Sequence, residues 1–136
     1  MTANAAPIFI LSPRVAAARI ATANVNRDGT GTVGSLCVAG ANGTRIDRII
    51  ITATATTTAG MIRFFSFDGT NYRAIKEVAV SAVTPSATVP AFNSEWVRPN
   101  TDTPPMPLLW LPPGYTLFAA TNNAESFDVV AFGGDY

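Results

Sequence analysis

The sequence predicts an all-β fold, an antiparallel β-sandwich of jelly-roll-like type with about eight short strands. Helix signals are nearly absent, and Thr, Val, Ile and Phe dominate in their place. Gly, Asn, Asp and Pro interrupt the apolar runs at intervals of about 8–12 residues, the spacing of strands joined by turns. The 136 residues correspond to one domain, large enough to bury a core without a disulfide or a metal.

The chain begins with a segment that we expect to form an extended arm over residues 1–14, leaving residues 15–136 as the single sandwich domain. In "APIFILSP" two prolines enclose four apolar residues. Proline restricts the backbone and removes a donor, so this arm is expected to be stiff and apolar. The alanine-rich residues 15–23 allow at most one turn of helix. Weaker strands are expected near Ile20 and over residues 33–38.

The clearest strand is "RIDRIIITATAT", residues 45–56, which follows a turn at Asn42–Gly43. It is apolar on both faces over Ile49–Ile51, which indicates a central strand. The next two strands, residues 61–67 and 72–82, form a hairpin around Asp68–Gly69. Further strands are expected over 88–97, where Pro90 interrupts or edges the strand, and over 115–121 and 126–132.

Residues 98–114 form a proline-rich loop that contains six of the chain's ten prolines. Because each proline lacks a backbone donor, we expect this loop to be extended and excluded from the sheets. Its large apolar side chains would each cost about 1.5–3 kcal/mol if left in water. The loop therefore covers an open end of its own sandwich or meets another subunit. For Trp110 taken alone, packing in the core is the favoured interpretation, and a contact with a partner is the alternative. The candidate subunit or capsid contacts are Ile8, Phe9, Ile10, Leu11, Met106, Leu108, Leu109, Trp110 and Leu111.

Composition excludes several classes of function. There is no histidine, which removes the commonest general base and metal ligand. Nine basic and nine acidic residues cancel, so an electrostatic nucleic-acid binder is not expected, and low charge favours association. The single Cys37 is expected to be a buried core thiol. No stretch suits a signal peptide or a membrane span, so we expect a protein made in the cytoplasm.

No motif predicts catalysis, a cofactor or a metal. "DGTGTVG" (28–34) lacks the lysine and the following helix of a phosphate loop, and "DGTNY" (68–72) lacks the carboxylates of a calcium loop. Both are expected to be loops or turns. Arg45 and Asp47 should share one strand face. Arg63 and Arg73 are expected to lie opposite one another or on neighbouring rungs of the hairpin, as surface charges or as polar anchors at a subunit contact.

The stretches "GANGTRIDRIIITATATTTAGMIRFFSFDGTNYR" and "NAESFDVVAFGGDY" resemble small structural proteins of tailed bacteriophages, in particular head decoration (capsid cement) proteins. The resemblance implies a non-enzymatic β protein on the capsid surface of the virion, often a homotrimer, with the phage major capsid protein as partner. It implies no catalytic residues. The alternatives are a tail, connector or fibre component of the virion, and a carbohydrate-binding module that uses Trp96, Trp110 or Tyr115.

Overall fold

The computed structural model describes residues 9–99 and 106–136, and these residues form nine β-strands. All strands pair antiparallel within two sheets, so the predicted all-β antiparallel sandwich is confirmed. The strands are β1 (Ser12–Ile20), β2 (Gly34–Val38), β3 (Thr44–Ala53), β4 (Gly60–Phe67), β5 (Tyr72–Val80), β6 (Asn93–Val97), β7 (Leu109–Leu111), β8 (Thr116–Thr121) and β9 (Phe127–Asp135).

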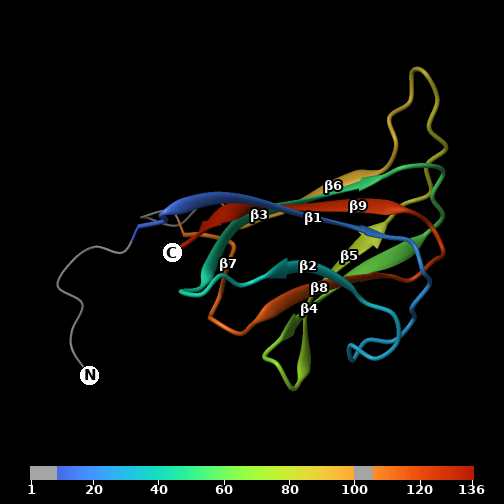
Figure 1. Ribbon diagram of the computed structural model, residues 1–136. Helices are drawn as coiled ribbons and strands as arrows, with labels where there is room; N and C mark the ends of the chain where they lie inside the picture. Colours follow the sequence, from blue (N-terminus) through green and yellow to red (C-terminus); the bar gives the residue numbers. More distant parts are fainter. Residues whose placement is uncertain (1–8, 100–105) are drawn as a thin grey trace, which may run out of the picture.

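The two sheets lie as stacked layers (Figure 1). The first sheet has the order β1-β9-β3-β6. β6 and β7 pair with the same edge of β3, β6 along residues 48–52 and β7 along residues 44–46. The second sheet has the order β2-β8-β4-β5. The pairing is nested, because β1 pairs with β9, β2 with β8, β3 with β6 and β4 with β5. This nesting pairs strands from the two ends of the chain and closes both sheets around the middle of the sequence.

The core lies between the sheets and follows the two-residue period of the strands. In the first sheet Ile49 of β3 lies opposite Ala131 of β9 and Trp96 of β6, and all three face inward. From the second sheet Phe64 meets them, with its ring centroid 5.2 Å from that of Trp96. Cys37 is buried, as predicted, and burial raises the pKa of its thiol.

The structure corrects the sequence prediction at the start of the domain. Residues 12–20 form one continuous strand, so the helical turn that was allowed at most over 15–23 does not form there, and the strand begins at Ser12, before the expected domain start at residue 15. The reason is tertiary: every residue of β1 has a partner in β9, and this pairing outweighs the weak helix preference of three alanines.

The proline-rich loop also differs from its prediction. Leu109–Leu111 forms β7 and pairs with Thr44–Ile46 of β3, although this loop was expected to stay outside the sheets. A strand at a sheet edge pairs on one side only, and these three residues between Pro107 and Pro112 all retain their N–H groups. Elsewhere the hairpin matches its prediction, whereas β3 ends at Ala53 and β6 begins at Asn93, after Pro90.

The loop of residues 21–33 covers part of the second sheet, against β4 and β8, whereas the edge strand β5 stays largely exposed. Asn24 N donates to Thr121 O at 2.8 Å, and a Cβ on Gly29 would lie 2.3 Å from Tyr72 Cβ. Beneath this loop Phe65 is fully buried, although it lies outside the main core. The glycine-rich residues 28–34 are therefore largely a packed cover, held in place by the fold.

Arg63 lies under the same loop and is buried, contrary to the predicted proximity of Arg63 and Arg73. In the observed register Arg63 lies opposite Glu77, and Arg73 lies opposite Ser66. Two-residue alternation alone did not predict this register, because a β-bulge between Phe64 and Phe65 shifts the pairing of β4 with β5.

Candidate functional site

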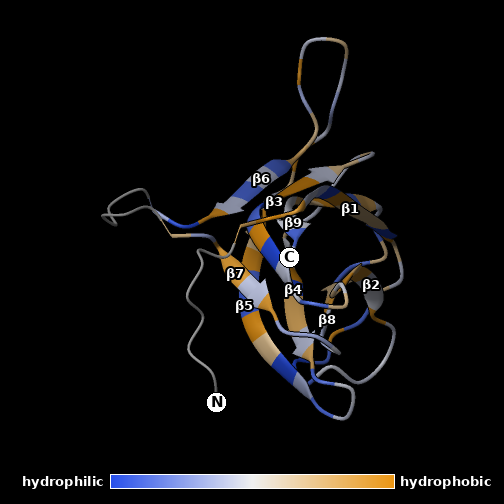
Figure 2. Ribbon diagram, turned by 60° about the vertical axis from the view of Figure 1, so that its left-hand side comes forward, coloured by the Kyte–Doolittle hydropathy of each residue, from blue (hydrophilic) through white to orange (hydrophobic). Residues whose placement is uncertain are grey.

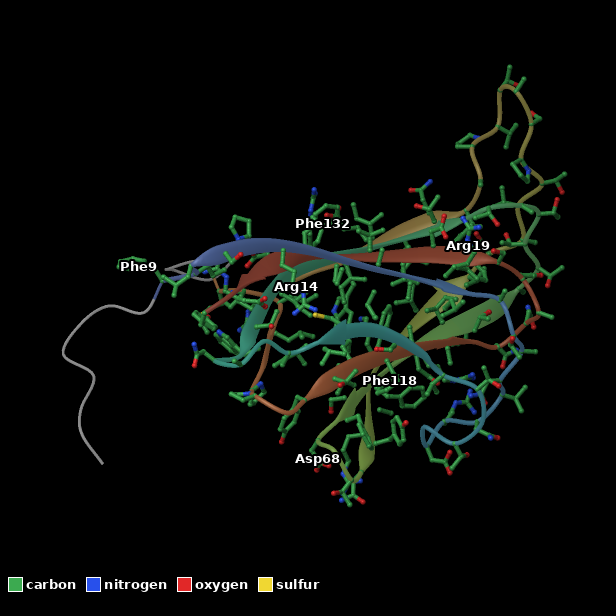
Figure 3. All side chains as sticks on the ribbon, in the orientation of Figure 1. Phe9, Arg14, Arg19, Asp68, Phe118 and Phe132 are labelled. Atoms are coloured by element: carbon green, nitrogen blue, oxygen red, sulfur yellow. The ribbon has the colours of Figure 1, made fainter. Side chains whose placement is uncertain are left out.

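The first sheet presents an uncovered face, which we call the outer face. It consists of the side chains of β1, β9, β3 and β6 that point away from the core. One row across it joins Val15, Phe132, Arg48 and Val97, which lie opposite one another in register. Figure 3 shows Phe132 above the first sheet and Arg14 on the opposite side, between the sheets.

A second row, next to the first, joins Ala17, Val130, Ile50 and Glu95. Val15, Ala17 and Val97 are exposed, and Val130, Ile50 and Phe132 are half-buried. Because the rows are adjacent, these six apolar side chains form a continuous band across four strands. A surface this apolar is typical of an interaction site when no part of the same chain covers it.

The charged side chains of the outer face are paired within the chain. Arg19 Nε and Nη2 donate to the two carboxylate oxygens of Asp128 at 2.7 and 3.0 Å, and these hydrogen bonds hold the pKa of Asp128 below its ordinary value. Arg48 Nη1 donates to Glu95 Oε1 at 3.3 Å, while its guanidinium lies 4.8 Å from the centre of the Phe132 ring. The outer face therefore combines apolar area with no unpaired charge among these groups.

The end of the predicted arm lies at one end of this face. Leu11 N donates to Asp135 O at 2.9 Å, which fixes the chain just before β1. Ile10 lies against Gly134, where a Cβ would be 2.2 Å from Ile10 Cγ2. Phe9 and Leu11 point into solvent and are 70% and 81% exposed. Of the predicted arm contacts, Ile8 lies outside the described residues.

The predicted contacts of the proline-rich loop separate into two groups. Met106 and Trp110 are exposed, whereas Leu108 and Leu109 are half-buried against the core. Leu111 is buried, so its prediction as a subunit contact is corrected: its side chain faces inward beside Thr44. Alternation along β7 explains the difference, because Trp110 must face outward when its two neighbours face inward.

The fold brings the arm and β7 to the same end of the first sheet. Pro13, Gly134, Arg45 and Trp110 form one row in register across β1, β9, β3 and β7. Trp110 is therefore separated from the arm by two strands, β9 and β3. The outer face, Phe9, Leu11 and Trp110 together form the candidate site, which we call the docking surface. Figure 2 shows hydrophobic colour along parts of the strands of this sheet.

Sequence reasoning missed the apolar residues at the centre of the docking surface. The signal was present in "RIDRIIITA" and "FDVVAF", which are apolar on both strand faces. The first run, at Ile49–Ile51, predicted a central strand, and both β3 and β9 are central, but one of the two faces they fill is left uncovered by the described residues.

The aromatic residues considered for carbohydrate stacking are not brought together. Trp96 lies in an inward row with Ile49, whereas Trp110 lies in an outward row with Arg45. Tyr115 packs against the core. A sugar-binding platform from these three side chains is therefore not formed.

The described part of the chain holds no group of three or more His, Cys, Asp or Glu side chains placed to bind a metal ion. Residues 9–99 and 106–136 also contain no helix long and apolar enough to cross a membrane. Comparison of the chain with protein-family models, with curated proteins and with solved structures found no match.

Proposed function

We propose that this protein is a non-enzymatic structural protein of a phage virion, which binds the capsid surface and stabilises it by bridging copies of the major capsid protein. The observation that carries the proposal is the apolar outer face, which no described segment covers, beside a second sheet that the loop of residues 21–33 covers in part. The resemblance of residues 40–73 and 123–136 to head decoration proteins supports the choice of partner.

The energetics favour a protein partner for the docking surface. Phe9, Leu11, Val15, Val97 and Trp110 are all large and exposed. Burying each of them in an interface would contribute on the order of 1.5–3 kcal/mol before the cost of association. A capsid offers the same contact many times, so modest single contacts are multiplied when one molecule or oligomer touches several subunits.

The pairing of these charges predicts how binding to the partner depends on salt. Arg19, Arg48 and their carboxylate partners already satisfy one another within the chain. Long-range attraction therefore contributes little, and binding should depend weakly on salt, because screening acts mainly on unpaired exposed charges. A nucleic-acid partner would show the opposite behaviour, with a steep loss of affinity as salt rises.

The test is binding of the purified protein to expanded shells of the phage that encodes it, measured by co-sedimentation at low and high salt. The Phe9→Ala/Trp110→Ala double variant should bind at least about tenfold more weakly, since two exposed anchors are lost. Its melting temperature should remain close to that of wild type, because both side chains are exposed. Ile75→Ala is the matched control, as Ile75 is an exposed apolar residue of β5 in the second sheet.

Absence of wild-type binding to shells would overturn the proposal, as would equal binding by wild type and the double variant. Immunolabelling of intact particles locates the protein. Label on the head supports the proposal, and label on the tail, connector or fibres alone would replace the capsid by that other part of the virion.

A further inference from the structure

The edge strands of the sandwich differ in a way that points to one of them as a pairing site. Natural sheets protect their edges by keeping strands short, by adding bulges, or by placing prolines or charges there. Among the described strands β6 has five residues and β7 has three, and β2 has five with a bulge between Ser35 and Cys37. β5 is longer, but it carries a bulge at Ile75 and the charged Lys76 and Glu77.

β1 has none of these protections along its centre. It is nine residues long and pairs with β9 in unbroken register, so it is straight where β2 and β5 are bulged. Val15–Ala18 carries no charge. Within the described part of the chain, the backbone of Ser12–Ile20 makes hydrogen bonds to β9 alone. The other edge of β1 is therefore a row of backbone donors and acceptors that no described residue uses.

The two arginines of β1 do not guard this edge. Arg14 turns inward, where Nη1 donates to Val38 O at 2.6 Å and to Asp135 Oδ1 at 3.2 Å. Arg19 is held by both carboxylate oxygens of Asp128 in β9. Figure 3 labels both arginines. The centre of this edge, Val15–Ala18, is uncharged and therefore does not attract a charged peptide. An uncharged strand of similar composition fits it best.

We infer that β1 of a second copy pairs antiparallel with β1 across a two-fold axis, joining two first sheets into one continuous sheet. Identical strands are self-complementary in this geometry. In a continuous sheet, residues directly opposite one another on neighbouring strands point to the same face. For two identical antiparallel strands this requires the two-fold axis to pass through a residue position and not between two positions. An axis at Ala16, the middle of β1, uses all nine residues of each strand.

This register avoids every like-charge contact in β1. Arg14 and Arg19 point to opposite faces of the strand, so a level register centred on Ala16 never places one opposite the other. Arg14 lies opposite Ala18 of the second copy, and Val15 lies opposite Ala17 of the second copy. Pro13, which cannot donate to a ladder, falls near the end of the paired region.

The pairing of β1 with β1 also has a consequence for binding to the shell, and this consequence rests on the proposed function. The outer faces of the two copies lie on the same side of the joined sheet and form one wider apolar surface. A dimer would therefore carry two docking surfaces side by side and gain avidity on a repetitive shell.

Sedimentation equilibrium of the full chain without shells tests the inference. Wild type should show twice the mass of the 14.3 kDa chain at micromolar concentration. The Val15→Lys/Ala17→Lys double variant places charges at the edge and should raise the dimer dissociation constant at least about tenfold. Ile50→Lys is the control: it puts one such charge on the same face two strands away and should leave the dimer intact. Circular dichroism and melting curves confirm that each variant is folded.

Cysteine cross-linking tests the register, with Cys37 buried in the core. Ala16→Cys should give a disulfide-linked dimer on mild oxidation, and Ala18→Cys should not, because only residue 16 meets itself at the axis. A monomeric wild type, a trimer mass, or dissociation by Ile50→Lys while the double variant stays dimeric would each overturn the inference. Shell binding of wild type is measured separately, so failure of the β1 pairing and failure of the proposed function are distinguishable.

Discussion

At the scale of single residues, Arg63 of β4 and Glu77 of β5 form an ion pair within the second sheet, and both also bind residues of the loop of residues 21–33. The Arg63 side chain is 4% exposed, and its Nε donates to Glu77 Oε1 at 2.8 Å. Its Nη1 reaches Asn24 O at 3.3 Å in the covering loop. Arg27 of that loop also donates to Glu77 at 2.9 Å. Hydrogen bonds from Arg63 and Arg27 hold the pKa of Glu77 below its ordinary value.

We expect Glu77→Gln to lower the melting temperature more than Glu95→Gln does. The two carboxylates are similarly exposed, at 39% and 45%; Glu95 binds Arg48, and Glu77 binds Arg63 and also the exposed Arg27. Their partners differ, because Arg63 is buried and Arg48 is 49% exposed. Neutralising Glu77 leaves a buried guanidinium without its counter-charge, whereas Arg48 remains in water. Thermal melts of both variants at pH 7 measure this, and equal shifts would show that the buried pair has no special weight.

At the scale of elements, the loop of residues 21–33 is a structured part of the sandwich and not a free connection between two strands. Asn24 Nδ2 donates to Thr30 O and Thr32 O at 2.9 and 2.8 Å, and so closes the loop on itself. Asp28 Oδ1 accepts from Thr30 N at 3.0 Å and stabilises the turn before Gly29. Because the loop is internally bonded and packed on Tyr72, it protects Phe65 from water.

Replacing Gly29 tests this cover, with Gly69 as the matched control. Both glycines have positive φ, at 89° and 99°, so alanine at either site costs about 1–2 kcal/mol of backbone strain. A Cβ at Gly69 meets nothing within 4 Å, but a Cβ at Gly29 would overlap Tyr72. Gly29→Ala should therefore destabilise the fold more and increase binding of a hydrophobic dye as Phe65 is uncovered. Equal denaturant midpoints and equal dye binding for the two variants would contradict the role of the loop as a cover.

At the scale of the whole molecule, the sandwich has two unlike outer surfaces. The loop of residues 21–33 covers part of the second sheet, and among the described residues the first sheet is left apolar and open, with exposed Phe9, Leu11 and Trp110 at one end. The loop of residues 81–92 projects beyond both layers (Figure 1). Covering one face stabilises the monomer, and leaving the other bare makes that face available to a partner.

The carboxylates of the whole molecule predict how its stability depends on pH. Hydrogen bonds from neighbouring donors lower the pKa of Asp28, Asp68, Glu77, Asp128 and Asp135. A lowered pKa in the folded state stabilises the protein above the unfolded value of about 4, and this stabilisation is lost as the pH falls through that value toward the folded pKa.

The melting temperature should therefore be nearly constant between about pH 6 and pH 8, where carboxylates stay ionised and the chain has no histidine to titrate. It should fall progressively below about pH 4. Asp135→Asn should reduce this acid loss, because Asp135 then no longer titrates against Thr44 and Arg14. Melting curves across the pH range measure both effects, and an acid loss unchanged in Asp135→Asn would exclude Asp135 as a contributor.

The amino-acid sequence by itself determined the features that depend on near neighbours. The hairpin around Asp68–Gly69, the burial of Cys37 and the all-β class follow from turn residues and two-residue periodicity, which act over a few positions. Only the tertiary structure decided the features that depend on pairing between distant segments. The strand at residues 12–20 exists because β9 lies beside it, β7 exists because β3 has a free edge, and Arg63 is buried where it meets Asn24 of the loop of residues 21–33. Whether an apolar face is covered depends on the path of the whole chain, and local preference contains no information about that path.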